Sequence, residues 1–119
     1  REKDRIDERE LIEIEHIFAR NRQEKEHALT DSRKLECLGN KSLLEKRINI
    51  RASDYRFEDK IKYYKGYTTD RGQVKEATKI RELLQLADSY SDFNEKNIDD
   101  RNESIIDGFI KYLNENKLF

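Results

Sequence analysis

The chain has 119 residues, of which 34% are hydrophobic and 43% are charged, and 25 basic side chains against 26 acidic ones give a net charge of −1. This length suits one domain and leaves no room for a second. The balanced charge excludes a protein that attracts nucleic acid through its overall field. Disorder is the competing interpretation of such a composition. We reject it because apolar residues recur at periods of two and of three to four, which indicates a small core built from a few regular elements.

The single cysteine, Cys37, excludes a disulfide within the chain, and no Cys-x-x-Cys pair is present to hold structural zinc. No apolar run approaches the roughly 20 residues of a membrane span, and no signal peptide opens the chain. We therefore expect a cytoplasmic protein. Residues 1–10 are highly charged and fit a linker or a frayed end, so we expect the chain to be a piece of a longer polypeptide.

The first predicted strand covers residues 11–16, where apolar and acidic residues alternate. Ile12 and Ile14 share one face of this strand, and the acidic residues share the other. Glu15 and His16, at its end, leave on opposite faces unless the chain bends there. Such a bend would aim the acid and the imidazole at one point, which metal-assisted hydrolysis of a phosphodiester requires.

The polar segment 21–36 predicts a loop or short helix between two strands of a small finger, with a turn or helix start at residues 30–32. His27 in this segment is a metal ligand only in principle, because a lone histidine among charged residues is far more often solvated. A second short strand is predicted around residues 43–44.

Asn40 precedes that second strand and offers one carbonyl acceptor and two amide donors. It could therefore tie the loop that carries His16 to the second strand. A simple Gly-Asn turn is the alternative interpretation of the same dipeptide.

Three helices are predicted in the rest of the chain. Phe57, Ile61 and Tyr64 recur at helical spacing, so the first helix begins at residue 50 or 54 and ends at Tyr64, with Gly66 as its C-terminal cap. A turn over residues 67–73 separates it from two amphipathic helices, expected over residues 74–89 and 95–114.

These elements predict an α+β fold that is mostly helical. Its small finger, two short antiparallel strands and a helix, covers about residues 11–65. The two later helices, within residues 74–114, are expected to pack on the finger as supporting layers, because the finger alone cannot bury enough apolar area.

Basic residues are concentrated between residues 33 and 65, a segment that contains ten basic and five acidic residues. A local excess of this kind favours contact with phosphates. A solvated charged face in a highly charged protein is the alternative.

Three motifs carry a resemblance to a known family. They are Glu15-His16-Ile17, then Gly39-Asn40-x-x-Leu43-Leu44, then Ile48-Asn49-x-x-Ala52-Ser53-x-x-x-Phe57-x-x-Lys60. Together they resemble the HNH (His-Me finger, ββα-metal) nucleases, and more closely the C-terminal nuclease domain of GmrSD-type modification-dependent restriction endonucleases. Residues 93–101 are similar to the segment that opens the last helix of that family, so the resemblance covers residues 11–113. The family usually has a proline after the histidine, whereas this chain has none.

The resemblance implies a metal-dependent DNA endonuclease domain with one Mg²⁺ or Mn²⁺ ion. It implies that His16 is the general base, that Asn40 positions it, and that Glu15 and Asn49 hold the metal. Asp54 stands where the family tends to have an asparagine, and it would add a direct or indirect metal contact.

The expected DNA phosphate contacts fall to four basic residues, Lys60, Arg51, Lys46 and Arg47. The expected partners are double-stranded DNA and a larger parent polypeptide with an N-terminal nucleotide-handling domain. The alternative function is a non-catalytic helical interaction or nucleic-acid-binding module in which Glu15-His16 is an incidental strand end.

Overall fold

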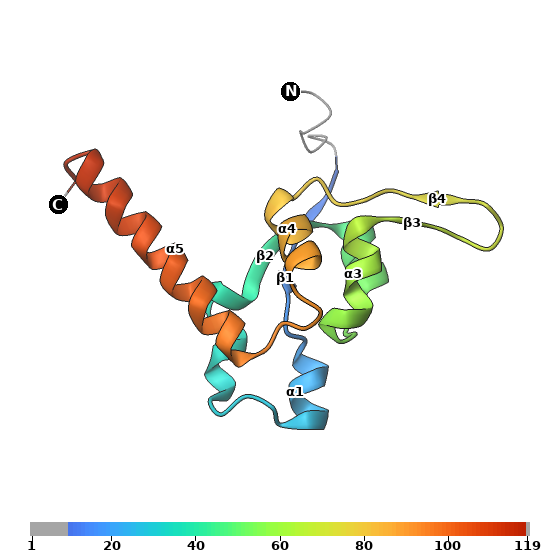
Figure 1. Ribbon diagram of the computed structural model, residues 1–119, viewed down its shortest axis with the longest axis horizontal. Helices are drawn as coiled ribbons and strands as arrows, with labels where there is room; N and C mark the ends of the chain where they lie inside the picture. The colour runs from blue at the N-terminus through green and yellow to red at the C-terminus, as the bar shows by residue number, and fades with distance from the viewer. Residues whose placement is uncertain (1–9, 119) are drawn as a thin grey trace.

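The computed structural model describes residues 10–118 of the chain. Residues 1–9, which hold most of the expected linker, lie outside the described part. The elements in chain order are β1 (Ile12–His16), α1 (Arg20–Glu26), the 3₁₀ helices η2 (Ser32–Glu36) and η3 (Leu38–Asn40), β2 (Lys41–Glu45), α2 (Lys46–Ala52), α3 (Phe57–Lys65), β3 (Tyr67–Thr68), β4 (Val74–Lys75), α4 (Arg81–Ser89) and α5 (Glu95–Glu115). The protein is thus a mostly helical α+β fold, and the predicted fold class is confirmed (Figure 1).

β1 and β2 form the antiparallel finger at the centre of the molecule (Figure 1). Ile14 lies opposite Leu43 in the register, and these two side chains are 53% and 54% exposed. Glu15 and Leu44 belong to the other face and are buried. The predicted alternation is therefore present, but the acidic face is the one turned inward.

The helix expected from residue 50 or 54 to Tyr64 is present as α3, close to the later of the two starts. The earlier start was wrong, because residues 46–52 form a separate helix, α2. Ser53 ends α2 with a φ of 48°, a left-handed conformation that a helix cannot continue through. Asn49 consequently lies on α2 and Lys60 on α3. Gly66 caps α3 with a φ of 82°, as its position predicts.

The helix expected from residue 74 begins only at residue 81, because β3 and β4 form a hairpin in front of it. The Thr69 amide donates to the carbonyl of Gln73 at 2.8 Å, and the Gly72 amide donates to Thr69 at 2.9 Å. Gly72 has a φ of 82°, so the glycine permits this tight turn. The hairpin extends away from the rest of the molecule in Figure 1.

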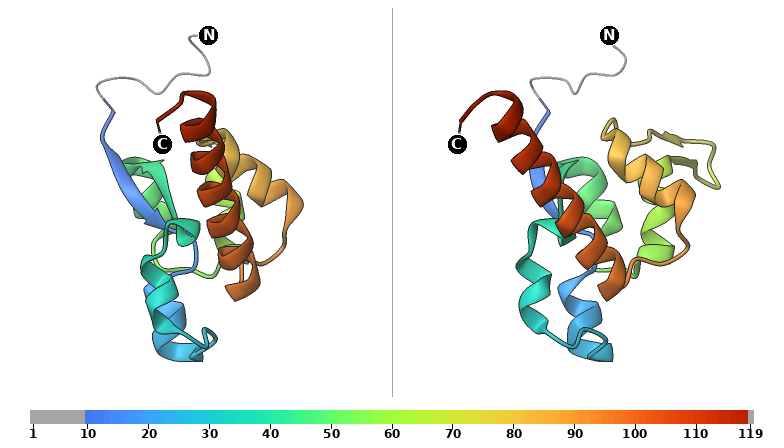
Figure 2. Two further views of the ribbon diagram at one scale, coloured as in Figure 1. Left: turned by 90° about the vertical axis from the view of Figure 1, so that its left-hand side faces the viewer. Right: turned by 60° about the vertical axis from the view of Figure 1, so that its left-hand side comes forward.

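The core lies between the finger and the helices. Its large buried side chains come from β2, from α2 to α5 and from the segments that follow β1 and precede α5: Ile17, Phe18, Leu44, Ile48, Phe57, Tyr64, Leu83, Phe93 and Ile98. α4 contributes Leu83 and Ala87 and so packs as a supporting layer. α5 does this only at its start. Its N-terminal part packs on η3, whereas its C-terminal part rises away from the body (Figures 1 and 2). The expectation that the whole last helix covers the finger was wrong for residues 103–115.

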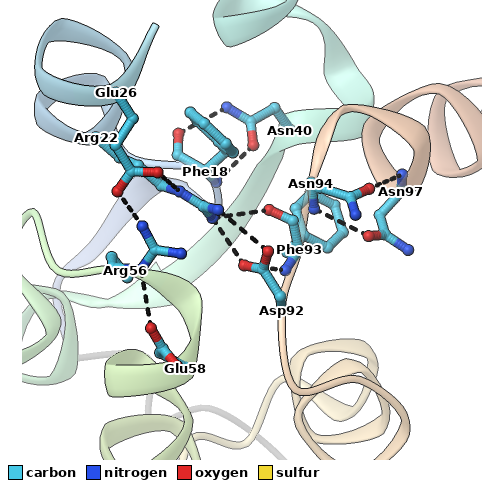
Figure 3. Close-up of polar contacts among 10 residues, drawn as sticks. All are labelled: Phe18, Arg22, Glu26, Asn40, Arg56, Glu58, Asp92, Phe93, Asn94 and Asn97. Carbon is cyan, nitrogen blue, oxygen red and sulfur yellow. Dashed lines mark hydrogen bonds and ion pairs between the residues drawn. The ribbon is translucent and has the colours of Figure 1, made fainter. Parts of the chain in front are cut away.

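Arg22 joins α1 to the segment before α5 (Figure 3). Its guanidinium donates to Asp92 at 2.8 and 3.1 Å and to the Phe93 carbonyl at 3.3 Å. It also lies 4.4 Å from the centre of the Phe18 ring. The hydrogen bond from Arg22 lowers the pKa of Asp92 below its ordinary value. This bidentate pair fixes α1 and, with it, the chain that follows β1.

Candidate active site

A polar cavity of about 290 Å³ lies where β1 ends, beside α2 and the loop that follows it. Its lining residues are Ile14, Glu15, His16, Ala19, Arg20, Asn49, Ser53, Asp54 and Lys60. The structure thus brings together the acid and imidazole of β1, the amide of α2 and the carboxylate of the next loop. These residues lie as far apart in the chain as positions 15 and 54.

His16 ends β1, and its Nε2 lies 3.2 Å from Oε2 of Glu36 on η2. The same carboxylate pairs with Lys41 and Arg20, each at 3.1 Å. The contact with His16, followed by that with Lys41, lowers the pKa of Glu36 to about 2, so this group is a carboxylate at neutral pH. In a neutral His16 whose Nε2 carries the proton, the Nε2–H group donates a hydrogen bond to Glu36. Nδ1 then remains as a proton acceptor.

Sequence reasoning did not select Glu36, although it pairs with His16. It lies 20 positions from His16 in a segment of alternating charges, and no spacing rule distinguishes it from its acidic neighbours.

Glu15 is buried beneath the cavity, with 3% of its side chain exposed. Its Oε2 accepts hydrogen bonds from Lys60, at 3.1 Å, and from the Tyr64 hydroxyl. Burial, and then the charge of Glu15, raise the pKa of Tyr64 well above 10, so the phenol remains a donor. Among the described residues Oε1 has no hydrogen-bond partner, and no buried side-chain oxygen is left unpaired. Oε1 is therefore the oxygen that opens to the cavity.

Lys60, on α3, binds both residues at the end of β1, Glu15 and His16. Its ammonium donates to the His16 carbonyl at 2.7 Å as well as to Glu15, and only 1% of the side chain is exposed. Burial lowers the pKa of Lys60, and the nearby Glu15 opposes that change. This position does not fit the expected contact with a DNA phosphate. Lys60 instead fixes the backbone bend at which the strand ends.

Asn40 lies behind the cavity, fully buried, and does not line it. Its Oδ1 accepts from the Phe18 amide at 2.7 Å, and its Nδ2 donates to the Phe18 carbonyl at 3.0 Å (Figure 3). Nδ2 also donates to the Leu35 carbonyl at 3.1 Å. Its own carbonyl accepts from Ile17 at 2.9 Å. The expected tie between the chain after His16 and the second strand is therefore present. Asn40 does not share the cavity with His16, and it acts on the backbone behind it.

Asn49 and Asp54 supply further oxygen atoms at the cavity. The Asn49 amide nitrogen donates to Glu13 at 2.9 Å, which leaves its carbonyl oxygen as an acceptor. Asp54 is exposed on the loop after α2. No cluster of three or more His, Cys, Asp or Glu side chains suited to a metal occurs within residues 10–118, so a metal there would need the amide oxygen. His27 ends α1 with a φ of 49° and does not line the cavity.

The basic residues expected at the site are distributed differently. Lys46 and Arg47 line another cavity with Glu10, and Arg47 pairs with that acid at 2.6 Å. Arg51 does not line the polar cavity. Arg20 does, with 63% of its side chain exposed, although its sequence position gave no reason to select it.

An acid, an imidazole and an amide around one cavity form a site of the kind used by hydrolytic enzymes. The chain belongs to the family of GmrSD restriction endonucleases, C-terminal domain, whose model matches residues 1–107. The resemblance carried by the three motifs is thereby confirmed, and the family indicates a nuclease domain. No curated protein and no solved structure matches the chain. Within residues 10–118, no helix combines the length and apolar character needed to cross a membrane.

Proposed function

We propose that this protein is a metal-dependent DNA endonuclease domain of the HNH (His-Me finger) type, which hydrolyses phosphodiester bonds. The observation that carries the proposal is the single cavity shared by Glu15, His16, Asn49 and Asp54. Family membership supports the nuclease part of this proposal. The metal and the histidine chemistry rest on the geometry of the site.

His16 is the proposed general base. Glu36 accepts a hydrogen bond from the Nε2–H group and holds the ring in place. Nδ1 then takes a proton from the water that attacks the phosphorus. Asn40 holds the backbone just after His16 and acts as a positioning residue.

Glu15, Asn49 and Asp54 are the proposed ligands of one divalent ion. A hard cation such as Mg²⁺ or Mn²⁺ takes oxygen ligands and retains several waters, which suits two carboxylates and one amide oxygen. When bound, the ion would stabilise the negative charge that develops on the phosphate. Lys60 and Tyr64 occupy the other oxygen of Glu15, and such outer contacts orient a ligating carboxylate.

The proposed substrate is double-stranded DNA, held mainly through its phosphates. Arg20 is the exposed cation on the cavity and takes the phosphate-binding role once expected of Lys60. Arg51 is the next candidate, because its helix also carries Asn49. We further propose that a larger parent protein in the cytoplasm supplies recognition of the DNA, since a site that grips the backbone reads few bases.

Cleavage of supercoiled plasmid tests the proposal, with Mg²⁺ or Mn²⁺ and with EDTA. The wild-type protein should nick the plasmid only with metal, and His16→Ala should reduce the rate by about 10²–10⁴-fold. His27→Asn is the matched control, because asparagine tolerates the left-handed backbone of that exposed histidine. Asn49→Ala should raise the metal concentration needed for the same rate.

Intact plasmid under every metal condition, with DNA binding retained, would contradict the proposal. That result would favour the alternative, a non-catalytic nucleic-acid-binding module.

A further inference from the structure

A second cavity lies next to the proposed active site and has a different chemistry. It measures about 310 Å³ and is lined by five residues of the same loop and of α3: Tyr55, Glu58, Asp59, Lys62 and Tyr63. A volume near 300 Å³ is at the small end of ligand-binding sites. Ser53 and Asp54 line the active-site cavity, and the next residue, Tyr55, lines this one. Since consecutive Cα atoms are about 3.8 Å apart, the two cavities are neighbours along one short loop.

Two of the five residues that line this second cavity, Tyr55 and Tyr63, are aromatic. The rings of Tyr55 and Tyr63 are stacked, with centroids 6.0 Å apart and planes inclined by 26°. Tyr67, at the base of the β3–β4 hairpin, meets the Tyr63 ring edge-on at 5.5 Å. Tyr63 is partly packed against the hydrophobic core, whereas Tyr55 is 47% exposed. Tyr55 is therefore an outward-facing ring supported by a second ring that the core holds in place.

The charges around the rings select between possible ligands. Glu58, which also pairs with Arg56 at 2.9 Å, and Asp59 set two carboxylates against the one ammonium of Lys62 on the cavity, and this balance disfavours a phosphate group. The same oxygens accept hydrogen bonds, as a nucleobase with its N–H groups requires. The Lys62 ammonium lies 5.0 Å from the centre of the Tyr63 ring and 5.5 Å from that of the Tyr67 ring. These cation–π contacts hold the ammonium against the rings. The cavity thus fits a flat base with N–H donors and disfavours the phosphate beside it.

We propose that Tyr55 and Tyr63 form a stacking platform for an unpaired nucleobase of the strand whose phosphate occupies the active-site cavity. Successive nucleotides in a duplex rise by about 3.4 Å, so a platform one or two residues from Asp54 serves a base close to the cut. A paired and stacked base cannot reach the platform, and the substrate must therefore contain or acquire an unpaired base there. The preferred DNA carries a bulge, a bubble or a single-stranded end. This inference rests on the proposed nuclease function, because that function places a phosphate next to Tyr55.

Equilibrium binding in EDTA tests the platform without cleavage. The probes are a short fluorescein-labelled duplex and the same duplex with one unpaired cytidine. The wild-type protein should bind the bulged duplex more tightly, and Tyr55→Ala should weaken that binding by about 5–150-fold, the usual value of one stacked base. Tyr55→Phe keeps the ring and should restore the affinity. Tyr90→Ala is the matched control, since Tyr90 is 46% exposed and lies outside both cavities.

Equal affinity of the wild-type protein for both probes, or an unchanged affinity of Tyr55→Ala for the bulged duplex, would overturn the platform. Plasmid cleavage by the same preparations in Mg²⁺ separates this failure from that of the proposed function. Cleavage with an unchanged Tyr55→Ala affinity removes the platform alone. A selective loss in Tyr55→Ala without any cleavage supports the platform and removes the nuclease.

Discussion

The two parts of α5 belong to one continuous helix and have opposite environments. The N-terminal part, residues 95–102, begins with a capping box between Asn94 and Asn97 (Figure 3). Ile98 in this part is 1% exposed. Arg101 donates to three backbone carbonyls of the segment around η3, at 2.7 to 3.0 Å. In residues 103–115 the apolar side chains continue at the same spacing, yet Phe109 is 61% exposed.

The difference teaches that helical periodicity identifies a face but not its neighbour. The packed part of α5 stabilises η3, and η3 contains Asn40, which holds the chain after His16. The exposed part supplies no contact to the site. Substitutions in residues 95–102 should therefore change the free energy of unfolding more than substitutions in residues 103–115.

The largest expected effect compares Ile98→Ala with Phe109→Ala. Loss of the buried Ile98 side chain removes core contacts and leaves a cavity, so unfolding should become easier by about 2–5 kcal/mol. Phe109→Ala should change stability by no more than about 0.5 kcal/mol, because its ring is largely solvated. Urea unfolding followed by circular dichroism measures both. Equal losses would show that residues 103–115 are packed in solution.

Gly39→Ala tests the contact between η3 and α5 from the other side. A Cβ at this position would lie 2.7 Å from the Asn102 amide nitrogen and would also meet the Ile98 carbonyl. These are backbone atoms that cannot move aside, so α5 must shift, at a cost of about 1–3 kcal/mol. The melting temperature should fall, and plasmid cleavage should fall with it because Asn40 follows Gly39. Unchanged unfolding would contradict the close approach of the two elements.

Local patterns allowed much of the fold to be predicted. The alternation in residues 11–16 predicted β1, and the spacing of the apolar residues in 95–114 predicted α5 within one residue of its end. The break at Ser53 could not be predicted, because a positive φ at serine has no local signature. The hairpin before α4 was missed because Val74 also fits the amphipathic pattern that continues into that helix.

The site was predicted as far as its residues carried motifs. Glu15, His16, Asn49 and Asp54 were selected from the sequence, and the structure joins them in one cavity. Arg20 also lines this cavity, whereas Glu36 contacts His16 and Arg20 without lining it. The folding of α1 and η2 places both residues, and no spacing in the chain encodes that. Lys60 was expected to contact a DNA phosphate, and its burial follows from the acid and the carbonyl to which it donates.

Glu82→Gln tests the ion pair between Glu82 on α4 and Arg101 on the packed part of α5, with a smaller expected loss of stability. Both oxygens of Glu82 accept from Arg101 at 2.8 Å, and these bonds lower the pKa of Glu82 below its ordinary value of 4.5. A carboxyl whose pKa is lowered on folding stabilises the protein above its unfolded pKa and loses that effect as the pH falls through the folded one. The variant should lose about 1 kcal/mol at pH 7, a value reduced for the half-exposed acid. Below the lowered pKa the difference should vanish.

The matched variant for this comparison is Glu103→Gln, on the exposed part of α5. Unfolding of both variants and of the wild type across a pH series measures the difference. Glu103→Gln should follow the wild type at every pH. A wild-type advantage over Glu82→Gln that persists unchanged into acid would contradict the role of the ion pair.

Gly108→Ala should have the smallest effect and the opposite sign. A Cβ at this position would have no atom within 4 Å, so nothing in the described part of the chain opposes the larger side chain. Glycine inside a helix costs about 0.5–1 kcal/mol relative to alanine, because its backbone loses more freedom on folding. The substitution should raise the free energy of unfolding by up to that amount if residues 103–115 unfold together with the body.

Amide hydrogen exchange distinguishes the two ways in which α5 can respond. If the exposed part frays independently, Gly108→Ala slows exchange in that part alone and leaves the urea midpoint unchanged. A loss of stability would mean that Gly108 faces a close neighbour in solution, and the contrast between the two parts of α5 would then be wrong.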